Sequence, residues 1–108
     1  MGIYVVSKRE FGEGGIYVGR GRGSVLGNPF VMKSEADREK VIAQYRIWLW
    51  QKVKERGKVF AELVRIKKLA EQGDVHLACW CRAKSNPRSC HGDVIKSCLE
   101  WMIKENIG

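Results

Sequence analysis

The feature that most constrains the fold is a buried strand followed after a short loop by a helix, near the end of the chain. Residues 75–81 read VHLACWC and are apolar apart from His76, as in a strand that is covered on both faces within a parallel sheet. The chain then passes through a basic loop to CHGD, after which apolar residues recur at helical spacing. We expect this helix to run from Ser89 to Glu105. Its expected buried residues are Val94, Ile95, Cys98, Trp101 and Met102.

Two short strands are expected near the start of the chain. Residues 3–6 and 16–18 are β-branched and aromatic, and a glycine-rich connection separates them. Because so short a connection leaves no room for a helical crossover, a hairpin or another antiparallel pairing is predicted.

The middle of the chain predicts two helices. Ser34 is a suitable N-cap, and Asp37 completes an approximate capping box with Asp in place of Glu. One apolar face follows, made of Val41, Tyr45, Trp48, Leu49 and Val53. After a break at Gly57, a second face continues to a stop at Gly73. That face is made of Phe60, Leu63, Val64, Ile66 and Leu69.

This order of elements predicts one α/β domain spanning residues 1–108. The expected architecture is Rossmann-like, with two or three layers, a short mixed sheet of three or four strands, and three main helices. Residues 75–81 should form the central strand, parallel to the first strand.

The charge balance favours acidic partners. A formal net charge of +8 and a pI near 9.6 attract polyanions, of which nucleic acid is the commonest. No apolar run approaches the length of a membrane span, and the first residues lack the order of a signal peptide, so a cytoplasmic protein is predicted. Few Asn, Gln and Pro beside abundant Lys, Glu and Arg are typical of a hyperthermophile.

A candidate site lies where the central strand leads to the last helix. Cys79 and Cys81 share one strand face, and residues 90–93 begin the helix, whose free N–H groups and positive dipole end favour thiolates and anions. Three functions are possible here. One is a zinc site formed by Cys79, Cys81, Cys90 and His91. Another is a nucleophilic Cys90 with His91 as base, Asp93 being a further catalytic candidate. The third, which we favour, is an anion site for a phosphate or nucleotide.

A purely structural interpretation of the same residues is also open. In it, Cys79 and Cys98 pack as small core residues and His91 caps its helix. Cys81 and Cys90 could then form a disulfide, which hyperthermophiles tolerate inside the cell.

Residues 19–30 read GRGRGSVLGNPF and resemble a phosphate cradle in composition. Glycines let backbone N–H groups approach an anion, and Arg20 and Arg22 add forked donors. The stretch matches neither common nucleotide-binding glycine motif, because no helix begins inside it. Its predicted position, on the same rim as Cys90 and His91, strengthens the case for a binding site.

The segments YVGRGRGSVLGNPF and LACWCRAKSNPRSCHGDVI together resemble the family called domain of unknown function 4326, with Arg38 and Tyr45–Trp48–Leu49 matching its middle part. The C…P…CH ending is also similar to that of domain of unknown function 488. Both resemblances imply a Rossmann-like α/β domain without an established activity. The family's motif positions fall on Gly19, Arg20, Gly27, Asn28, Pro29, Phe30, Arg38, Cys79, Cys81, Cys90, His91, Gly92 and Asp93.

The sequence therefore predicts binding of a nucleotide or other phosphate-bearing ligand, and leaves open whether a reaction is catalysed. The expected ligand-binding residues are Gly19, Arg20, Arg22, Gly27, Asn28, Arg38, Cys90, His91, Gly92 and Asp93. The alternative is a basic nucleic-acid-binding module without catalysis. Its phosphate contacts would be Arg20, Arg22, Lys52, Lys54, Arg56, Lys67 and Lys68. Zinc is the one cofactor that the cysteines suggest, and no protein partner can be deduced.

Overall fold

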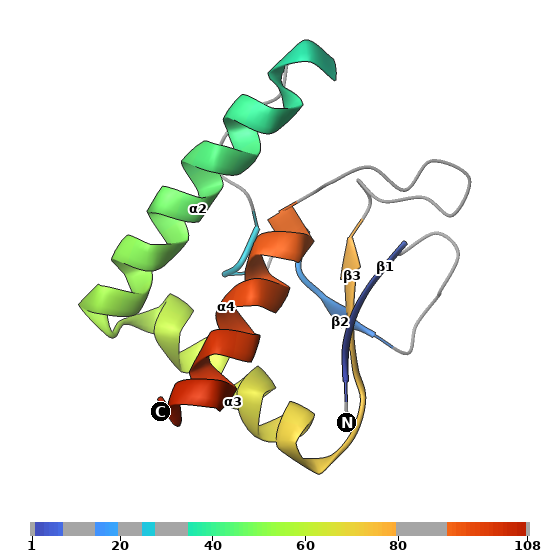
Figure 1. The fold of residues 1–108 in the computed structure, drawn as a ribbon, viewed down its shortest axis with the longest axis vertical. Helices are drawn as coiled ribbons and strands as arrows, with labels where there is room; N and C mark the ends of the chain where they lie inside the picture. Colours follow the sequence, from blue (N-terminus) through green and yellow to red (C-terminus); the bar gives the residue numbers. More distant parts are fainter. Residues whose placement is uncertain (1, 8–14, 20–24, 28–34, 80–90, 108) are drawn as a thin grey trace.

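The computed structural model describes residues 2–7, 15–19, 25–27, 35–79 and 91–107 (Figure 1). These residues form a small α/β domain. Its elements, in chain order, are β1 (Ile3–Ser7), β2 (Ile16–Tyr17), the 3₁₀ turn η1 (Glu35–Asp37), α2 (Arg38–Glu55), α3 (Lys58–Gln72), β3 (Val75–Cys79) and α4 (His91–Glu105).

The described strands form one parallel sheet in the order β1-β3-β2. β1 pairs along its whole length with β3, from Ile3 opposite Val75 to Ser7 opposite Cys79. The short β2 pairs with Leu77 and Ala78 on the other side. The prediction of a central β3 parallel to the first strand is therefore confirmed.

The predicted antiparallel relation of the first two strands is wrong, and so is the mixed sheet, because β1 and β2 both run parallel to β3. The crossover is short because β2 starts level with Leu77, which lies opposite Val5, only two residues before β1 ends. The chain returns about 7 Å along the strand and crosses two strand spacings, about 10 Å. Eight residues separate Ser7 from Ile16, and a chain of that length can cover this distance, so the parallel arrangement requires no helical crossover.

The buried face of α2 matches the predicted apolar spacing. Its buried residues are Val41, Tyr45, Leu49 and Val53, and Trp48 is partly buried beside them. The helix ends at Glu55 and is followed by the C-cap Arg56, in a left-handed conformation with φ 58°; Gly57 then precedes α3. Ser34, the predicted N-cap, lies outside the described residues. Asp37 precedes α2 directly, and its side chain makes no capping hydrogen bond.

Two predicted core residues are instead exposed. In α3 the buried stripe is Val59, Leu63, Ile66, Lys67 and Ala70, which leaves Leu69 at its edge with 42% of its surface exposed. In α4, Val94, Ile95, Cys98 and Met102 are buried as predicted. Trp101 is 36% exposed, because it lies beside that stripe. Its ring packs edge-on against the ring of Trp50 of α2, with centroids 4.8 Å apart.

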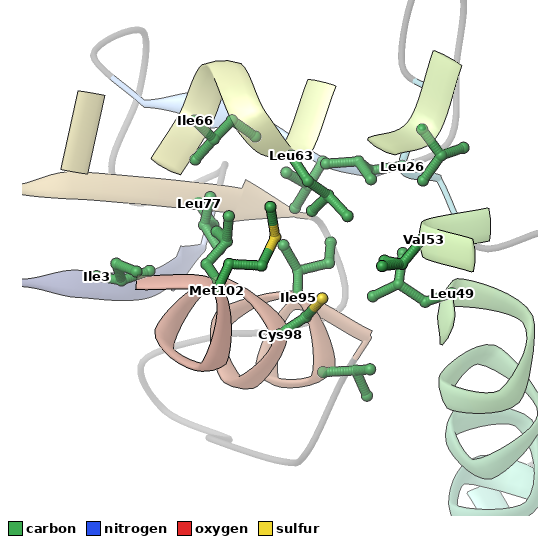
Figure 2. Close-up of a cluster of buried hydrophobic side chains, with 14 of the residues drawn as sticks. Ile3, Leu26, Leu49, Val53, Leu63, Ile66, Leu77, Ile95, Cys98 and Met102 are labelled. Carbon is green, nitrogen blue, oxygen red and sulfur yellow. The ribbon is translucent and has the colours of Figure 1, made fainter. Parts of the chain in front are cut away.

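One core joins the sheet to the three helices. Figure 2 shows Ile3 and Leu77 of the sheet meeting Met102 and Ile95 of α4, with side chains of α2 and α3 closing the far side. α4 covers the sheet face that carries Ile3 and Leu77 (Figure 1). Leu26, between the strands and α2 in the chain, is also buried in this core. The predicted core residue Phe30 lies outside the described residues.

Candidate functional site

The carboxyl edge of the sheet is the place where loops from different parts of the chain converge. Because β1, β2 and β3 run parallel, the chain leaves all three strands at this edge, the edge where open α/β sheets bind ligands. α4 is the next element after β3. The site is therefore assembled from the residues that follow β2 and from the first turn of α4.

His91, the first residue of α4, joins the helix to the end of β2. Its Nε2 lies 2.7 Å from the carbonyl oxygen of Val18. Since a carbonyl can only accept a hydrogen bond, Nε2 carries the proton and donates it. The side chain is buried, with 6% of the residue exposed. The start of α4 is thus fixed to the residue that precedes Gly19.

Tyr45 of α2 holds a second point of the glycine-rich stretch, at Leu26. Its hydroxyl donates a buried hydrogen bond of 2.7 Å to the carbonyl oxygen of Leu26, which precedes Gly27. The same ring meets the ring of His91 edge to face, with centroids 5.1 Å apart and planes at 76°. His91 of α4 and Tyr45 of α2 therefore contact each other, and each holds a backbone carbonyl at or near the glycine-rich stretch.

Gly19 is packed closely by a neighbouring ring. A Cβ atom at Gly19 would lie 2.6 Å from the hydroxyl oxygen of Tyr17 and 2.8 Å from its ring carbons. A larger residue at this position would therefore require the Tyr17 ring to move.

A family model described as "Domain of unknown function (DUF4326)" matches residues 6–101 of the chain. The chain belongs to the DUF4326 family. The match spans both segments that carried the resemblance, the glycine-rich loop and the Cys-His segment. Searches of the curated proteins and of the solved structures gave no match.

The positions at which the resemblance placed the family's motifs, where the structure describes their burial, divide into buried and half-buried residues. Gly19, His91 and Gly92 are buried, while Gly27, Arg38 and Asp93 are half-buried. Arg38 begins α2 on the same face as Tyr45, about two turns nearer the helix start. Cys79 ends β3, with its backbone opposite Ser7. The remaining motif positions, Arg20, Asn28, Pro29, Phe30, Cys81 and Cys90, lie outside the described residues, and so does Arg22, the further candidate for ligand binding.

Sequence reasoning did not identify Tyr45 as part of the site. It placed Tyr45 on a buried helix face but gave its hydroxyl no partner. A buried tyrosine hydroxyl nearly always has a hydrogen-bond partner. The presence of a tyrosine on an apolar helix face could therefore have indicated a contact with another part of the chain. The hydrogen bond of His91 to Val18 was not predicted either, because the two residues are 73 positions apart in the sequence.

The structure shows which of the basic residues predicted to contact nucleic-acid phosphates are exposed. Lys67 is buried, with 3% exposed, and its Nζ lies 4.0 Å from Glu71, so it is not available to phosphates and this part of the prediction is wrong. Lys52 pairs with Glu55 at 3.3 Å. Lys54, Arg56 and Lys68 are exposed.

The cysteine predictions are tested only at Cys98. This residue is buried in the core as predicted, and burial raises the pKa of its thiol to about 11. Within the described ranges, no three His, Cys, Asp or Glu side chains lie together in a way that could hold a metal ion. Nor is any described helix both long and apolar enough to cross a bilayer.

Proposed function

We propose that this DUF4326 protein binds a nucleotide or another phosphate-bearing ligand at the carboxyl edge of its sheet. The binding surface, here called the phosphate rim, consists of residues 19–30, Cys90 and the first turn of α4 from His91 to Asp93. The observation that carries the proposal is the pair of buried hydrogen bonds, His91 to Val18 and Tyr45 to Leu26. Together they hold Val18, just before the glycine-rich stretch, and Leu26, within it, beside a helix start.

The chemistry of the phosphate rim suits an anion. The first N–H groups of α4 have no acceptor within the helix, and the positive end of the helix dipole lies with them. Arg20 and Arg22 stand in the stretch between the two fixed points and offer guanidinium groups that bind phosphate oxygens with two parallel hydrogen bonds. Glycines on either side let the backbone approach the ligand.

His91 has a positioning role in this proposal. Its Nε2 proton is engaged by the carbonyl of Val18 and only 6% of the residue is exposed. The imidazole therefore acts through the place it gives to Gly19 and Arg20. Arg38 is the further candidate for ligand contact, because it is half-buried at the start of α2 on the helix face of Tyr45.

Calorimetric titration with a panel of nucleotides and with inorganic pyrophosphate tests the proposal. Arg20→Ala should weaken binding about 10- to 150-fold, because a hydrogen bond to a charged group contributes about 1.5–3 kcal/mol. The control is Lys104→Ala, which removes the same charge from an exposed residue in the last turn of α4, about 20 Å from the helix start. Equal effects of the two variants, or no binding by any ligand of the panel, would refute the phosphate rim.

Salt dependence separates this function from the basic nucleic-acid module. Binding by spread phosphate contacts falls steeply with salt, because each contact releases a counterion. A ligand held by fixed donors in the phosphate rim should lose much less affinity over the same range. The alternative also loses Lys67, which is buried.

A further inference from the structure

The side of α2 that faces away from the core carries a second apolar stripe. Ala43, Ile47 and Trp50 follow one another at intervals of four and three residues, so their side chains share one face of the helix. Each residue turns the helix by about 100°, which places Ile47 opposite the buried Tyr45. Figure 1 shows α2 on the outside of the molecule, with α4 and the sheet to one side of it. Ile47, at the centre of the stripe, therefore points away from the core.

Ile47 is 63% exposed, the highest value for a large apolar side chain among the described residues. The outer side of a surface helix normally carries polar residues, because apolar surface is more stable out of water. Trp50, one turn further along, is half-buried and packs edge-on against Trp101 of α4, which is itself partly exposed. One continuous apolar patch thus spans α2 and α4. Contiguous apolar side chains on a surface, unlike single ones, indicate an interaction site.

Two exposed side chains of opposite charge continue the stripe at its ends. Glu39 precedes Ala43 by four residues, and Lys54 follows Trp50 by four, so both lie on the stripe face. Neither side chain makes an ion pair or a hydrogen bond with another residue in the described part of the chain. The stripe is therefore acidic at its amino end, apolar in the middle and basic at its carboxyl end.

We infer that this stripe is a dimer contact, and that it packs antiparallel against the same stripe of a second copy of the chain. The antiparallel direction follows from the charges, because it puts Glu39 of each copy opposite Lys54 of the other, whereas parallel helices would bring like charges together. In the same register Ala43 lies opposite Trp50, so the smallest side chain faces the largest. Ile47 then lies at the two-fold axis. The intervals of four, three and four residues are those of a coiled-coil seam.

The size and charge of the chain are compatible with this dimer. From Glu39 to Lys54 the stripe is about 22 Å long, or about two heptads. A single helix pair of this length is at the low end of specific interfaces, so we expect a dissociation constant in the micromolar range. The net charge of +8 opposes association, but charges outside the contact are screened beyond about 8 Å at physiological salt. The stripe lies on the side of α2 opposite Tyr45, so this inference and the phosphate rim can fail independently.

Sedimentation equilibrium of the full chain at physiological salt measures the dissociation constant of the dimer. Ile47→Asp should raise this constant about tenfold or more, because it removes an apolar contact at the two-fold axis and puts two like charges there. The matched control is Ile103→Asp, the same change at another exposed isoleucine, on α4 and outside the stripe. It should leave the constant within about twofold of that of the original chain. Circular dichroism confirms that both variants are folded.

Charge reversal tests the register. Glu39→Lys and Lys54→Glu should each weaken the dimer about tenfold, because each puts like charges opposite one another twice in the dimer. The two variants shift the net charge in opposite directions, so a general charge effect would strengthen the dimer in one of them. The double variant, Glu39→Lys with Lys54→Glu, exchanges the partners and should bind within about threefold of the original chain. A monomer at every concentration, or a double variant no tighter than the single ones, would overturn the inference.

Discussion

Replacing Tyr45 by Phe removes one atom from the contact that holds the glycine-rich stretch. Tyr45 is fully buried, and its hydroxyl donates to the carbonyl oxygen of Leu26 at 2.7 Å. The ring, with its contacts to His91 and Trp48, remains in place in the variant. The change therefore isolates the hydrogen bond from the packing around it.

The expected loss of stability depends on the Leu26 carbonyl, which is left without a donor when the Tyr45 hydroxyl is removed. A typical intramolecular hydrogen bond contributes about 0.5–1.5 kcal/mol, but a buried acceptor left without its donor costs about 1–3 kcal/mol. The Leu26 carbonyl lies in such a buried contact. We therefore expect Tyr45→Phe to lower the free energy of unfolding by about 1–3 kcal/mol. Ligand affinity at the phosphate rim should fall as well, because one fixed point of the stretch is released.

Urea unfolding measures the first effect. The midpoint should fall while the slope stays unchanged, since the surface exposed on unfolding is the same. The matched control is Tyr4→Phe, which removes the same oxygen from a half-exposed ring and should change stability by less than about 0.5 kcal/mol. If Tyr45→Phe costs no more than Tyr4→Phe, the hydroxyl does not hold Leu26 and the described arrangement of the site is refuted.

Two further predictions concern buried groups outside the site. Because burial raises the pKa of the Cys98 thiol from 9.0 to about 11, its contribution to stability is complete below pH 9 and is lost as the pH rises through 11. The loss should be about 3 kcal/mol in the original chain and absent from the pH profile of Cys98→Ala, and parallel profiles would contradict it. Lys67→Met should change the free energy of unfolding by less than about 1 kcal/mol or raise it, because the buried Lys67 ammonium has only a 4.0 Å contact with the exposed Glu71, and an apolar residue of similar size avoids burying a charge. A loss above about 3 kcal/mol on thermal unfolding would show that the ammonium group is needed.

The apolar pattern predicted the framework because burial has a simple signature in the sequence. The continuous run in β3 identified the central strand, and the spacing of Val41, Tyr45, Leu49 and Val53 identified the buried face of α2. The pattern fixes such a stripe only to within about one residue. Leu69 and Trp101 therefore fell on the wrong side of its edge, and Lys67, with its long aliphatic stem, fell inside.

The topology and the contacts of the site depend on distances that the sequence does not contain. The parallel β2 was missed because its short crossover is possible only when β2 starts level with Val5, which is a matter of register. The partners of His91 and Tyr45 are backbone carbonyls, which every residue has, so residue type does not mark them. Val18 and His91 lie together because β2 and β3 run parallel and end at one edge, and the antiparallel pairing predicted for the first two strands did not imply this.

A map of backbone amide shifts during titration with a nucleotide tests the central claim most directly. The claim predicts shifts that cluster at Gly19 and Gly27 of the glycine-rich stretch and at residues 91–93, the start of α4. Shifts confined to the exposed surfaces of α2 and α3 would contradict it, as would the absence of any shift with every nucleotide tried.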